Sequence, residues 1–83
     1  MIRLILYGTH GCHLCEDAEF LLSKAIQAKG AEIPVEIVDI AEKLELEHRY
    51  GVRIPVVRDS ASGAELGWPF DEERLGEFLH SLS

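Results

Sequence analysis

The two cysteines of this 83-residue chain stand three positions apart, where a short apolar strand meets a helix. Residues 11–15 read Gly-Cys-His-Leu-Cys and follow the apolar run from Ile2 to Tyr7. The first turn of a helix carries unpaired backbone N–H groups and the positive end of the helix dipole, so it stabilises a thiolate. A disulfide across so short a loop would remove only ~2 kcal/mol of unfolded-state entropy. The pair therefore favours a bond that opens and closes during a reaction over a structural crosslink.

Composition narrows the class of protein and of partner. The chain has 15 acidic and 8 basic residues, and its net charge of −7 argues against nucleic acid or an anionic membrane as a partner. With 47% apolar residues it can build one core, so we expect a single domain over residues 1–83. No apolar stretch approaches the ~20 residues of a membrane helix, and residues 1–7 are too short for a signal-peptide core. We therefore expect a cytoplasmic protein, where two cysteines favour catalysis or metal binding.

The first half of the chain predicts a strand, a helix and a second strand. The helix is expected from about Cys12 to Lys29, followed by Gly30 as its C-terminal cap. Residues 35–40 are rich in β-branched side chains and predict the second strand. A helix between two strands implies a parallel pair with a right-handed connection. The apolar stripe of the helix consists of Leu14, Ala18, Leu21, Leu22, Ala25 and Ile26.

The second half predicts a short helix, a hairpin and a last helix. Residues 41–50 are rich in Glu, Leu and Lys and predict a helix that ends before Gly51. Residues 54–58 and 64–67 predict two strands, joined by the turn-rich residues 59–63 as an antiparallel hairpin. Asp71 is the expected N-cap of the last helix. The apolar face of that helix consists of Leu75, Phe78, Leu79 and Leu82.

The element order βαβαββα, with a CxxC after the first strand, resembles the thioredoxin fold over essentially the whole chain. Residues 50–57, Tyr-Gly-Val-Arg-Ile-Pro-Val-Val, resemble the thioredoxin-superfamily segment that leads into the cis-proline strand. Residues 11–18 and the sequence Trp68-Pro69-Phe70-Asp71 are most similar to small bacterial glutaredoxin-like proteins. The resemblance implies an α/β fold in which three helices flank a four-stranded mixed sheet, with spatial strand order 4-3-1-2.

The resemblance also implies an activity, that of a thiol–disulfide oxidoreductase. Cys12 would be the exposed nucleophile and Cys15 the resolving thiol. Pro55 would lie opposite Cys12 in a cis peptide bond and leave the backbone of Ile54 free to pair with an extended substrate chain. The expected partner is a disulfide-containing protein or glutathione, with glutathione as a co-substrate, and the protein is expected to act as a monomer without a bound organic cofactor.

Several positions depart from the two families. Residues 1–11 contain no acid, so the buried carboxylate that moves protons in thioredoxins is missing. Glutaredoxins usually carry a lysine before the motif, which holds a carboxylate of glutathione, and this chain has Thr-His-Gly at positions 9–11. Asp71, at the start of the last helix, and Arg53, near the cis-proline, are the alternative candidates for binding glutathione. Trp68 is a candidate wall of a substrate groove, and core packing is the other interpretation of that residue.

Two further residues belong to the expected surroundings of the motif. His13 replaces one of the residues usual between glutaredoxin cysteines, and its imidazolium would favour the Cys12 thiolate, whereas the acids that follow would oppose it. Together with the helix dipole, this predicts a pKa of the Cys12 thiol modestly below its usual value. Tyr7, at the end of the first strand, would either line the active site or pack in the core.

The same cysteines allow two other functions. Together with His10 and His13 they make four potential zinc ligands, but all four lie on one turn and one rigid helix end, so a site shared across a dimer is the better metal hypothesis. The chain would then be a metal or iron–sulfur binding module. Alternatively it would be a redox-sensing partner protein, whose disulfide forms reversibly without turnover.

Overall fold

The structure, a computed structural model, describes residues 2–30, 32–51 and 53–82. Val52, within the segment that resembles the cis-proline region, lies outside the described residues. The elements follow the predicted order, with one additional turn of 3-10 helix, η1, before the second helix. Their bounds are β1 Leu4–Gly8, α1 His13–Lys29, β2 Val35–Asp39, η1 Ile40–Glu42, α2 Leu44–Tyr50, β3 Val56–Asp59, β4 Glu65–Gly67 and α3 Glu72–Leu82.

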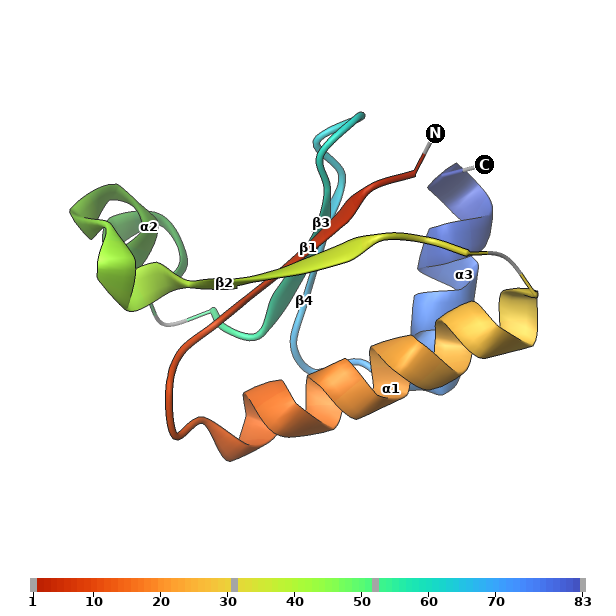
Figure 1. Ribbon diagram of the computed structural model, residues 1–83, viewed down its shortest axis with the longest axis horizontal. Coiled ribbons are helices and arrows are strands. Elements are labelled where there is room, and N and C mark those ends of the chain that lie inside the picture. The colour runs from red at the N-terminus through yellow and green to blue at the C-terminus, as the bar shows by residue number, and fades with distance from the viewer. Residues whose placement is uncertain (1, 31, 52, 83) are drawn as a thin grey trace.

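The four strands form one mixed sheet in the order β2-β1-β3-β4 (Figure 1). β1 pairs with β2 in parallel and with β3 antiparallel, and β4 pairs antiparallel with β3. The predicted mixed sheet and its strand order are confirmed. Because β2 and β4 are the edge strands, β1 lies in the middle of the sheet and delivers the cysteine motif from a central position.

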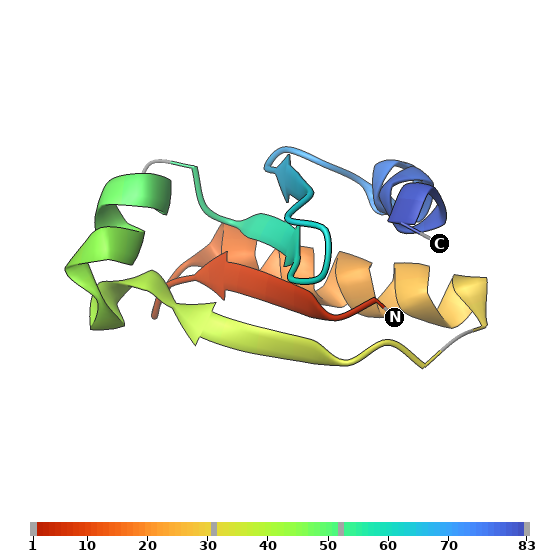
Figure 2. The same ribbon diagram turned by 90° about the horizontal axis from the view of Figure 1, so that it is seen from above.

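The main core lies between the sheet and the helices α1 and α3. These two helices contact each other and cover one face of the sheet (Figure 2). Alternate residues of a strand point to opposite faces, so Leu4 and Leu6 of β1 enter this core together with Val57 of β3. The helices contribute the buried residues Ala18, Leu22, Ala25, Leu75 and Leu79.

A smaller core lies on the opposite face. Tyr7 and Val56 point away from α1 and pack against Ile40 of η1 and Tyr50 of α2. The Tyr7 and Tyr50 rings stack with centroids 4.3 Å apart and planes 19° apart. The two cores together show why apolar residues fill β1 without alternation, since both of its faces are covered.

The predicted helix over residues 41–50 is wrong at its start. Lys43 is extended, with φ −138° and ψ 128°, and separates η1 from α2. Ile40 and Tyr50 both pack in the smaller core, whereas a straight helix between them would hold them about 15 Å apart. The break lets both side chains reach the same cluster. The Asp39 carboxylate caps the start of η1 by accepting a hydrogen bond from the Ala41 N–H at 2.9 Å.

The long helix α1 is close to its prediction. It begins at His13, with Cys12 as the N-cap, and ends before Gly30, whose φ of 72° is the left-handed conformation expected of a glycine cap. Leu14, predicted as part of the buried stripe, is 46% exposed because it lies on the first turn, ahead of the part of α1 that contributes to the core. No described helix is both long and apolar enough to cross a membrane.

Candidate active site

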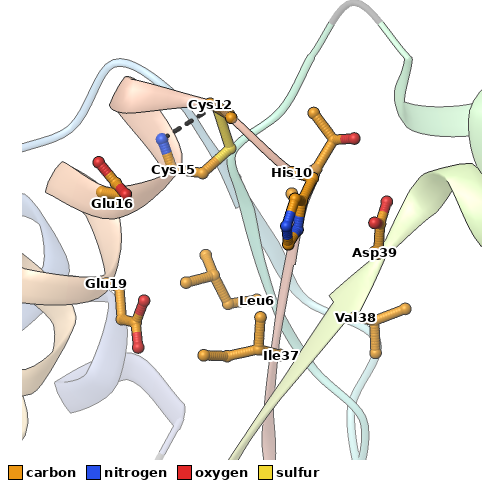
Figure 3. A pocket seen from close by; sticks show the side chains of 12 residues that line it. Leu6, His10, Cys12, Cys15, Glu16, Glu19, Ile37, Val38 and Asp39 are labelled. Carbon is orange, nitrogen blue, oxygen red and sulfur yellow. Dashed lines mark hydrogen bonds between the residues drawn. A yellow bond between two sulfur atoms is a disulfide. The ribbon is translucent and has the colours of Figure 1, made fainter.

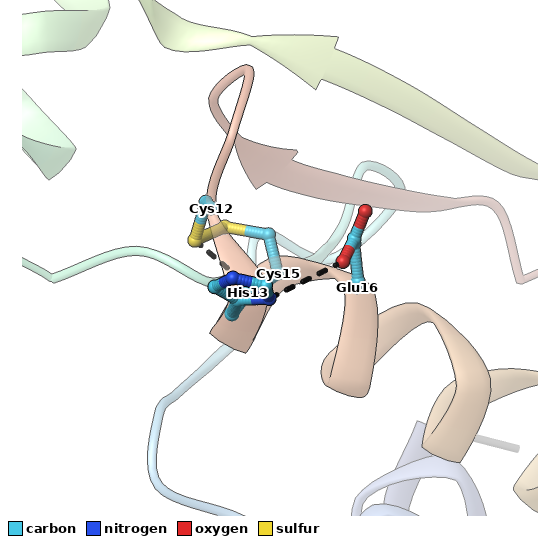
Figure 4. The surroundings of a disulfide bond; sticks show 4 residues. All are labelled: Cys12, His13, Cys15 and Glu16. Carbon is cyan, nitrogen blue, oxygen red and sulfur yellow. Dashed lines mark hydrogen bonds and ion pairs between the residues drawn. A yellow bond between two sulfur atoms is a disulfide. The ribbon is translucent and has the colours of Figure 1, made fainter.

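The two cysteines form a disulfide at the N-terminus of α1. Cys12 is the N-cap, with extended backbone, and the Cα atoms of Cys12 and Cys15 are 5.2 Å apart. The Cys12 sulfur accepts a hydrogen bond from the Cys15 N–H at 3.1 Å (Figure 4). One of the four unpaired N–H groups of the helix terminus therefore points at the sulfur of Cys12. The same donor is placed to stabilise a thiolate there when the disulfide is reduced.

Gly8, at the end of β1, backs the disulfide from inside the protein. A Cβ atom on Gly8 would lie 2.9 Å from the Cys15 sulfur and 3.1 Å from the Cys15 Cβ, closer than nonbonded atoms normally approach. The absence of a side chain at this position therefore lets α1 begin directly against the sheet. Gly8 was not among the site residues expected from the sequence. Its place at the end of an apolar strand, four residues before the motif, was the available signal.

A cleft of about 280 Å³ opens beside the disulfide, between α1 and β2. Leu6 and Ile37 line its floor, and Cys12 and Cys15 line one end (Figure 3). Its remaining lining includes His10 of the loop before the motif, Glu16 and Glu19 of α1, and Val38 and Asp39 of β2. Both cysteines are half-buried, so the disulfide is reachable from this cleft.

His13 points away from the cleft. Its side chain is 96% exposed, and its Nδ1 atom is 3.7 Å from a carboxylate oxygen of Glu16, one helical turn along α1 (Figure 4). When the imidazole is protonated, the two groups form an exposed ion pair. Glu16 therefore offsets the positive charge that His13 was expected to contribute near Cys12.

The predicted surroundings on the other side of the motif belong largely to the smaller core. Tyr7 is buried against Tyr50, so it packs rather than lining the cleft, and half-buried Ile54 packs on the same cluster. The Ile54–Pro55 peptide bond is cis, as the resemblance implied. Because Tyr7 pairs with Val56 in the antiparallel register, buried Pro55 comes to the level of Gly8, next to the disulfide-bearing loop.

Arg53 and Asp71, the candidates for binding glutathione, and Trp68, the candidate groove wall, do not line the cleft. The Arg53 guanidinium donates to Glu65 of β4 at 3.2 Å, and its carbon lies 5.6 Å from the centre of the Tyr50 ring. Asp71 caps α3 by accepting a hydrogen bond from the Arg74 N–H at 2.8 Å. Trp68 directly follows β4, which ends at Gly67. Its ring makes an edge-on contact with the Phe70 ring, with centroids 5.0 Å apart, and packs on the main core.

Glu65 is the centre of a polar cluster that sequence analysis missed. It accepts hydrogen bonds from the Tyr50 hydroxyl at 2.5 Å, from Arg58 at 2.9 Å and from Arg53. The Tyr50 hydroxyl, followed by the two guanidinium groups, lowers the pKa of Glu65. Burial, and then the bond to Glu65, raises the pKa of Tyr50. No local pattern marked these residues, because they meet only through the pairing of β3 with β4 and the position of α2.

Metal binding is the alternative chemistry that the cysteines allow. Within residues 2–30, 32–51 and 53–82, no three His, Cys, Asp or Glu side chains come together as a metal-binding group.

The glutaredoxin-like domain family (DUF836) matches residues 3–80. This chain belongs to that family. The match includes the cysteine motif, the cleft and the hairpin, so the glutaredoxin-like domain accounts for nearly the whole described structure. A comparison with curated proteins found no significant match.

Solved structures with a similar fold cover nearly the whole chain. The target protein XcR50 from X. campestris is 40% identical, with a TM-score of 0.80 over 94% of this chain and 96% of that one. Protein Ne2328 from Nitrosomonas europaea is 29% identical, with a TM-score of 0.70 over 93% and 89% of the two chains. Thioredoxin-2 of a malaria parasite is 14% identical, with a TM-score of 0.72 over 98% and 82%, and at that identity it supports the fold alone. The glutaredoxin-like domain therefore has the thioredoxin-like fold.

Proposed function

We propose that this glutaredoxin-like domain is a thiol–disulfide oxidoreductase that reduces disulfides of proteins or of glutathione. The observation that carries the proposal is the Cys12–Cys15 disulfide at the N-terminus of α1, half-buried beside an open cleft. A thiolate at this position has a backbone donor at hydrogen-bond distance and a route for a substrate sulfur to approach. Family membership supports a redox role of this kind.

The reaction uses both cysteines of the reduced protein. The Cys12 thiolate attacks one sulfur of the substrate disulfide, forms a mixed disulfide, and releases the other substrate thiol, which takes up a proton. Cys15 then loses its proton, attacks the Cys12 sulfur and releases the second substrate thiol. The two electrons that reduce the substrate come from the dithiol, which becomes the Cys12–Cys15 disulfide. Two molecules of glutathione, or a reductase protein, return the domain to the dithiol.

The two cysteines receive different roles because their surroundings differ. Cys12 is the N-cap and faces the end of the helix, whereas the Cys15 sulfur lies against the position of Gly8 on the inner side. We therefore assign Cys12 as the nucleophile and Cys15 as the resolving thiol. We place the activity in the cytoplasm, in a monomer without a bound organic cofactor, where it would contribute to thiol redox balance and electron transport.

A redox titration tests the proposal directly. The protein is equilibrated in defined dithiothreitol and glutathione buffers, and the free thiols are alkylated and counted by mass spectrometry. We expect one two-electron transition between about −180 and −270 mV, the range of dithiol oxidoreductases. The Cys15→Ser variant should accumulate a glutathione adduct on Cys12, while Cys12→Ser should accumulate none.

Two results would contradict the proposal. Thiols that resist oxidation throughout, in a protein purified with stoichiometric metal, would establish the metal-binding module in its place. A reversible disulfide with negligible turnover of any disulfide substrate would establish a redox sensor.

A further inference from the structure

The cleft beside the disulfide has an apolar floor because α1 covers β1 and leaves β2 open. Leu6 and Ile37 are neighbours in the parallel register, so their side chains point to the same face of the sheet. Leu6 is 2% exposed, whereas Ile37 is 59% exposed. Figure 3 shows both side chains at the bottom of the opening beneath the disulfide. The accessible apolar surface in the cleft that holds the redox centre is therefore mainly that of Ile37.

The walls of the cleft carry negative charge. Glu16 and Glu19 lie three residues apart on α1 and line one side, and Asp39, at the end of β2, lines the other. The twelve lining residues include no lysine or arginine, and the imidazole of His10 is their one basic group. His13 lies outside the cleft, with its Nδ1 atom 3.7 Å from a carboxylate oxygen of Glu16.

The disulfide, rather than this acidity, marks the cleft as a site. A substrate sulfur must approach Cys12, so groups that flank the substrate disulfide fall against these walls. The cleft volume of about 280 Å³ is large enough for one long side chain. Lysine and arginine bury an aliphatic stem on apolar surface while the charged end stays near water and carboxylates. The apolar floor provides a surface for the aliphatic stem, and the acidic walls provide carboxylates for the charged end.

We infer that this cleft receives a lysine or arginine side chain next to the reacting cysteine of a polypeptide substrate. The inference rests on the proposed oxidoreductase function and specifies its substrate class. A glutathionyl group has two carboxylates and one ammonium group, so it enters the same cleft against repulsion from the glutamates. The chain therefore selects cationic polypeptide disulfides over glutathione disulfides.

Two short peptides test the inference in a single turnover. Both carry one cysteine as a 2-pyridyl disulfide and differ only in the residue beside it, lysine in one and glutamate in the other. The reduced, desalted protein attacks the peptide sulfur through Cys12 and releases 2-thiopyridone, followed by absorbance. Cys15 then releases the peptide thiol as the protein disulfide forms.

The assay is run at pH 8, where imidazoles are largely neutral. Each rate is divided by the rate of the same peptide with dithiothreitol, whose only charge is that of the reacting thiolate, to remove the intrinsic reactivity of the peptide.

We expect the lysine peptide to react about fivefold to tenfold faster than the glutamate peptide at low salt, as attraction in one case and repulsion in the other combine. The ratio should fall to about twofold in about 0.5 M salt, where the screening length is only a few ångströms. The double variant Glu16→Gln/Glu19→Gln should give a ratio of about two at any salt concentration. Glu77→Gln, an exposed residue of α3 outside the cleft, removes one carboxylate of the same kind and should keep the wild-type ratio.

The outcomes separate this inference from the function on which it rests. Equal normalised rates for both peptides, or a faster glutamate peptide, would overturn the cationic preference while the thiol–disulfide exchange itself would stand. The cationic preference would also be overturned if Glu77→Gln lowered the rate ratio as much as the double variant does. The net charge of the protein, rather than the cleft, would then be responsible for the preference. Failure to react with either peptide, with both protein thiols free by titration, would overturn the proposed function and this inference together.

Discussion

At the level of single residues, Gly8 decides how closely Cys15 can approach the sheet. In the disulfide the Cys15 sulfur is held by two bonds and cannot rotate away, whereas the reduced side chain can change its rotamer. A methyl group at position 8, 2.9 Å from that sulfur, therefore conflicts more with the oxidised protein than with the reduced protein.

Gly8→Ala should destabilise the oxidised protein by about 1–3 kcal/mol, the usual cost of overpacking. The reduced form should lose less stability than the oxidised form, so the disulfide of the Gly8→Ala variant should be easier to reduce than that of the wild type. Denaturant unfolding of both redox forms, with the titration described above, measures this difference. Gly67→Ala is the matched control, since a Cβ at Gly67 would meet no atom within 4 Å. Equal stability of the two variants in the oxidised form would contradict this role of Gly8.

Asp59 is a second residue whose surroundings carry a prediction. It is 3% exposed and accepts hydrogen bonds from the Ser62 hydroxyl at 2.7 Å and from the backbone N–H groups of Ser62, Arg3 and Ala61. The Ser62 hydroxyl, with these amides, lowers the pKa of Asp59 although burial opposes it. A lowered pKa in the folded state means that the carboxylate stabilises the fold above the usual aspartate pKa of about 3.9, and that this contribution is lost as the pH falls further.

Asp59→Asn should destabilise the protein by about 1–3 kcal/mol at pH 7, because the amide replaces an acceptor with a donor facing N–H groups. The difference from the wild type should begin to narrow below about pH 4, where Asp59 of the unfolded chain becomes protonated, and should narrow further until the pH passes the lowered pKa of the folded protein. Urea unfolding at pH 7 and pH 3 measures both effects. The control is Asp17→Asn, at an exposed position of α1, which should change the free energy of unfolding little at either pH. A difference that stays constant with pH would refute the assignment.

At the level of elements, α2 is attached to the sheet through Tyr50 and its contact with Glu65. The Tyr50 hydroxyl binds the Glu65 carboxylate of β4, which also binds Arg58 of β3, while the Tyr50 ring stacks on Tyr7 of β1. Glu65 therefore connects the end of the second helix with the hairpin. The segment that holds Pro55 runs between these two elements.

Glu65→Gln should loosen α2 more than the rest of the fold. We expect a loss of about 1–2 kcal/mol, since these hydrogen bonds are charge-assisted but partly screened by solvent. Amide hydrogen exchange should become faster in residues 44–50 and stay unchanged in α1 and α3. Glu45→Gln, at an exposed position of α2 itself, is the control. Unchanged protection of α2, or a uniform loss over the whole chain, would show that Glu65 does not hold this helix.

At the level of the whole molecule, both buried cores are built without the cysteines, so we expect the fold to be the same in the two redox states. The main core draws its buried side chains from β1, β3, α1 and α3, and the smaller core lies on the far face of the sheet. Neither core includes the cysteines. The disulfide closes a loop with a sequence separation of three residues, so it constrains the unfolded chain only slightly.

The reduced protein should therefore keep its native circular dichroism spectrum and be less stable than the oxidised protein by about 2 kcal/mol. Denaturant unfolding in the presence and absence of dithiothreitol measures the difference, and Cys12→Ser/Cys15→Ser should match the reduced wild type. A reduced chain that is unfolded without denaturant would make the disulfide structural, contrary to the proposed reaction.

The sequence by itself determined the element order and the position of the cysteine motif. The signals for these elements arise from interactions between residues a few positions apart, so they can be recognised in the sequence. They are the apolar periodicity, the cap residues Gly30 and Asp71, and the turn-rich residues 59–63. The strand order 4-3-1-2 and the cis bond before Pro55 came from the family resemblance and not from such patterns.

The tertiary structure alone decided the rest. The break at Lys43 exists because Ile40 and Tyr50 must reach one cluster, and the close approach of Gly8 to Cys15 exists because the first turn of α1 lies against the end of β1. The cleft depends on how far α1 extends over β2. Each of these features depends on the distance between segments that are remote in sequence. Such distances follow from the packing of whole elements rather than from the local periodicity of the chain.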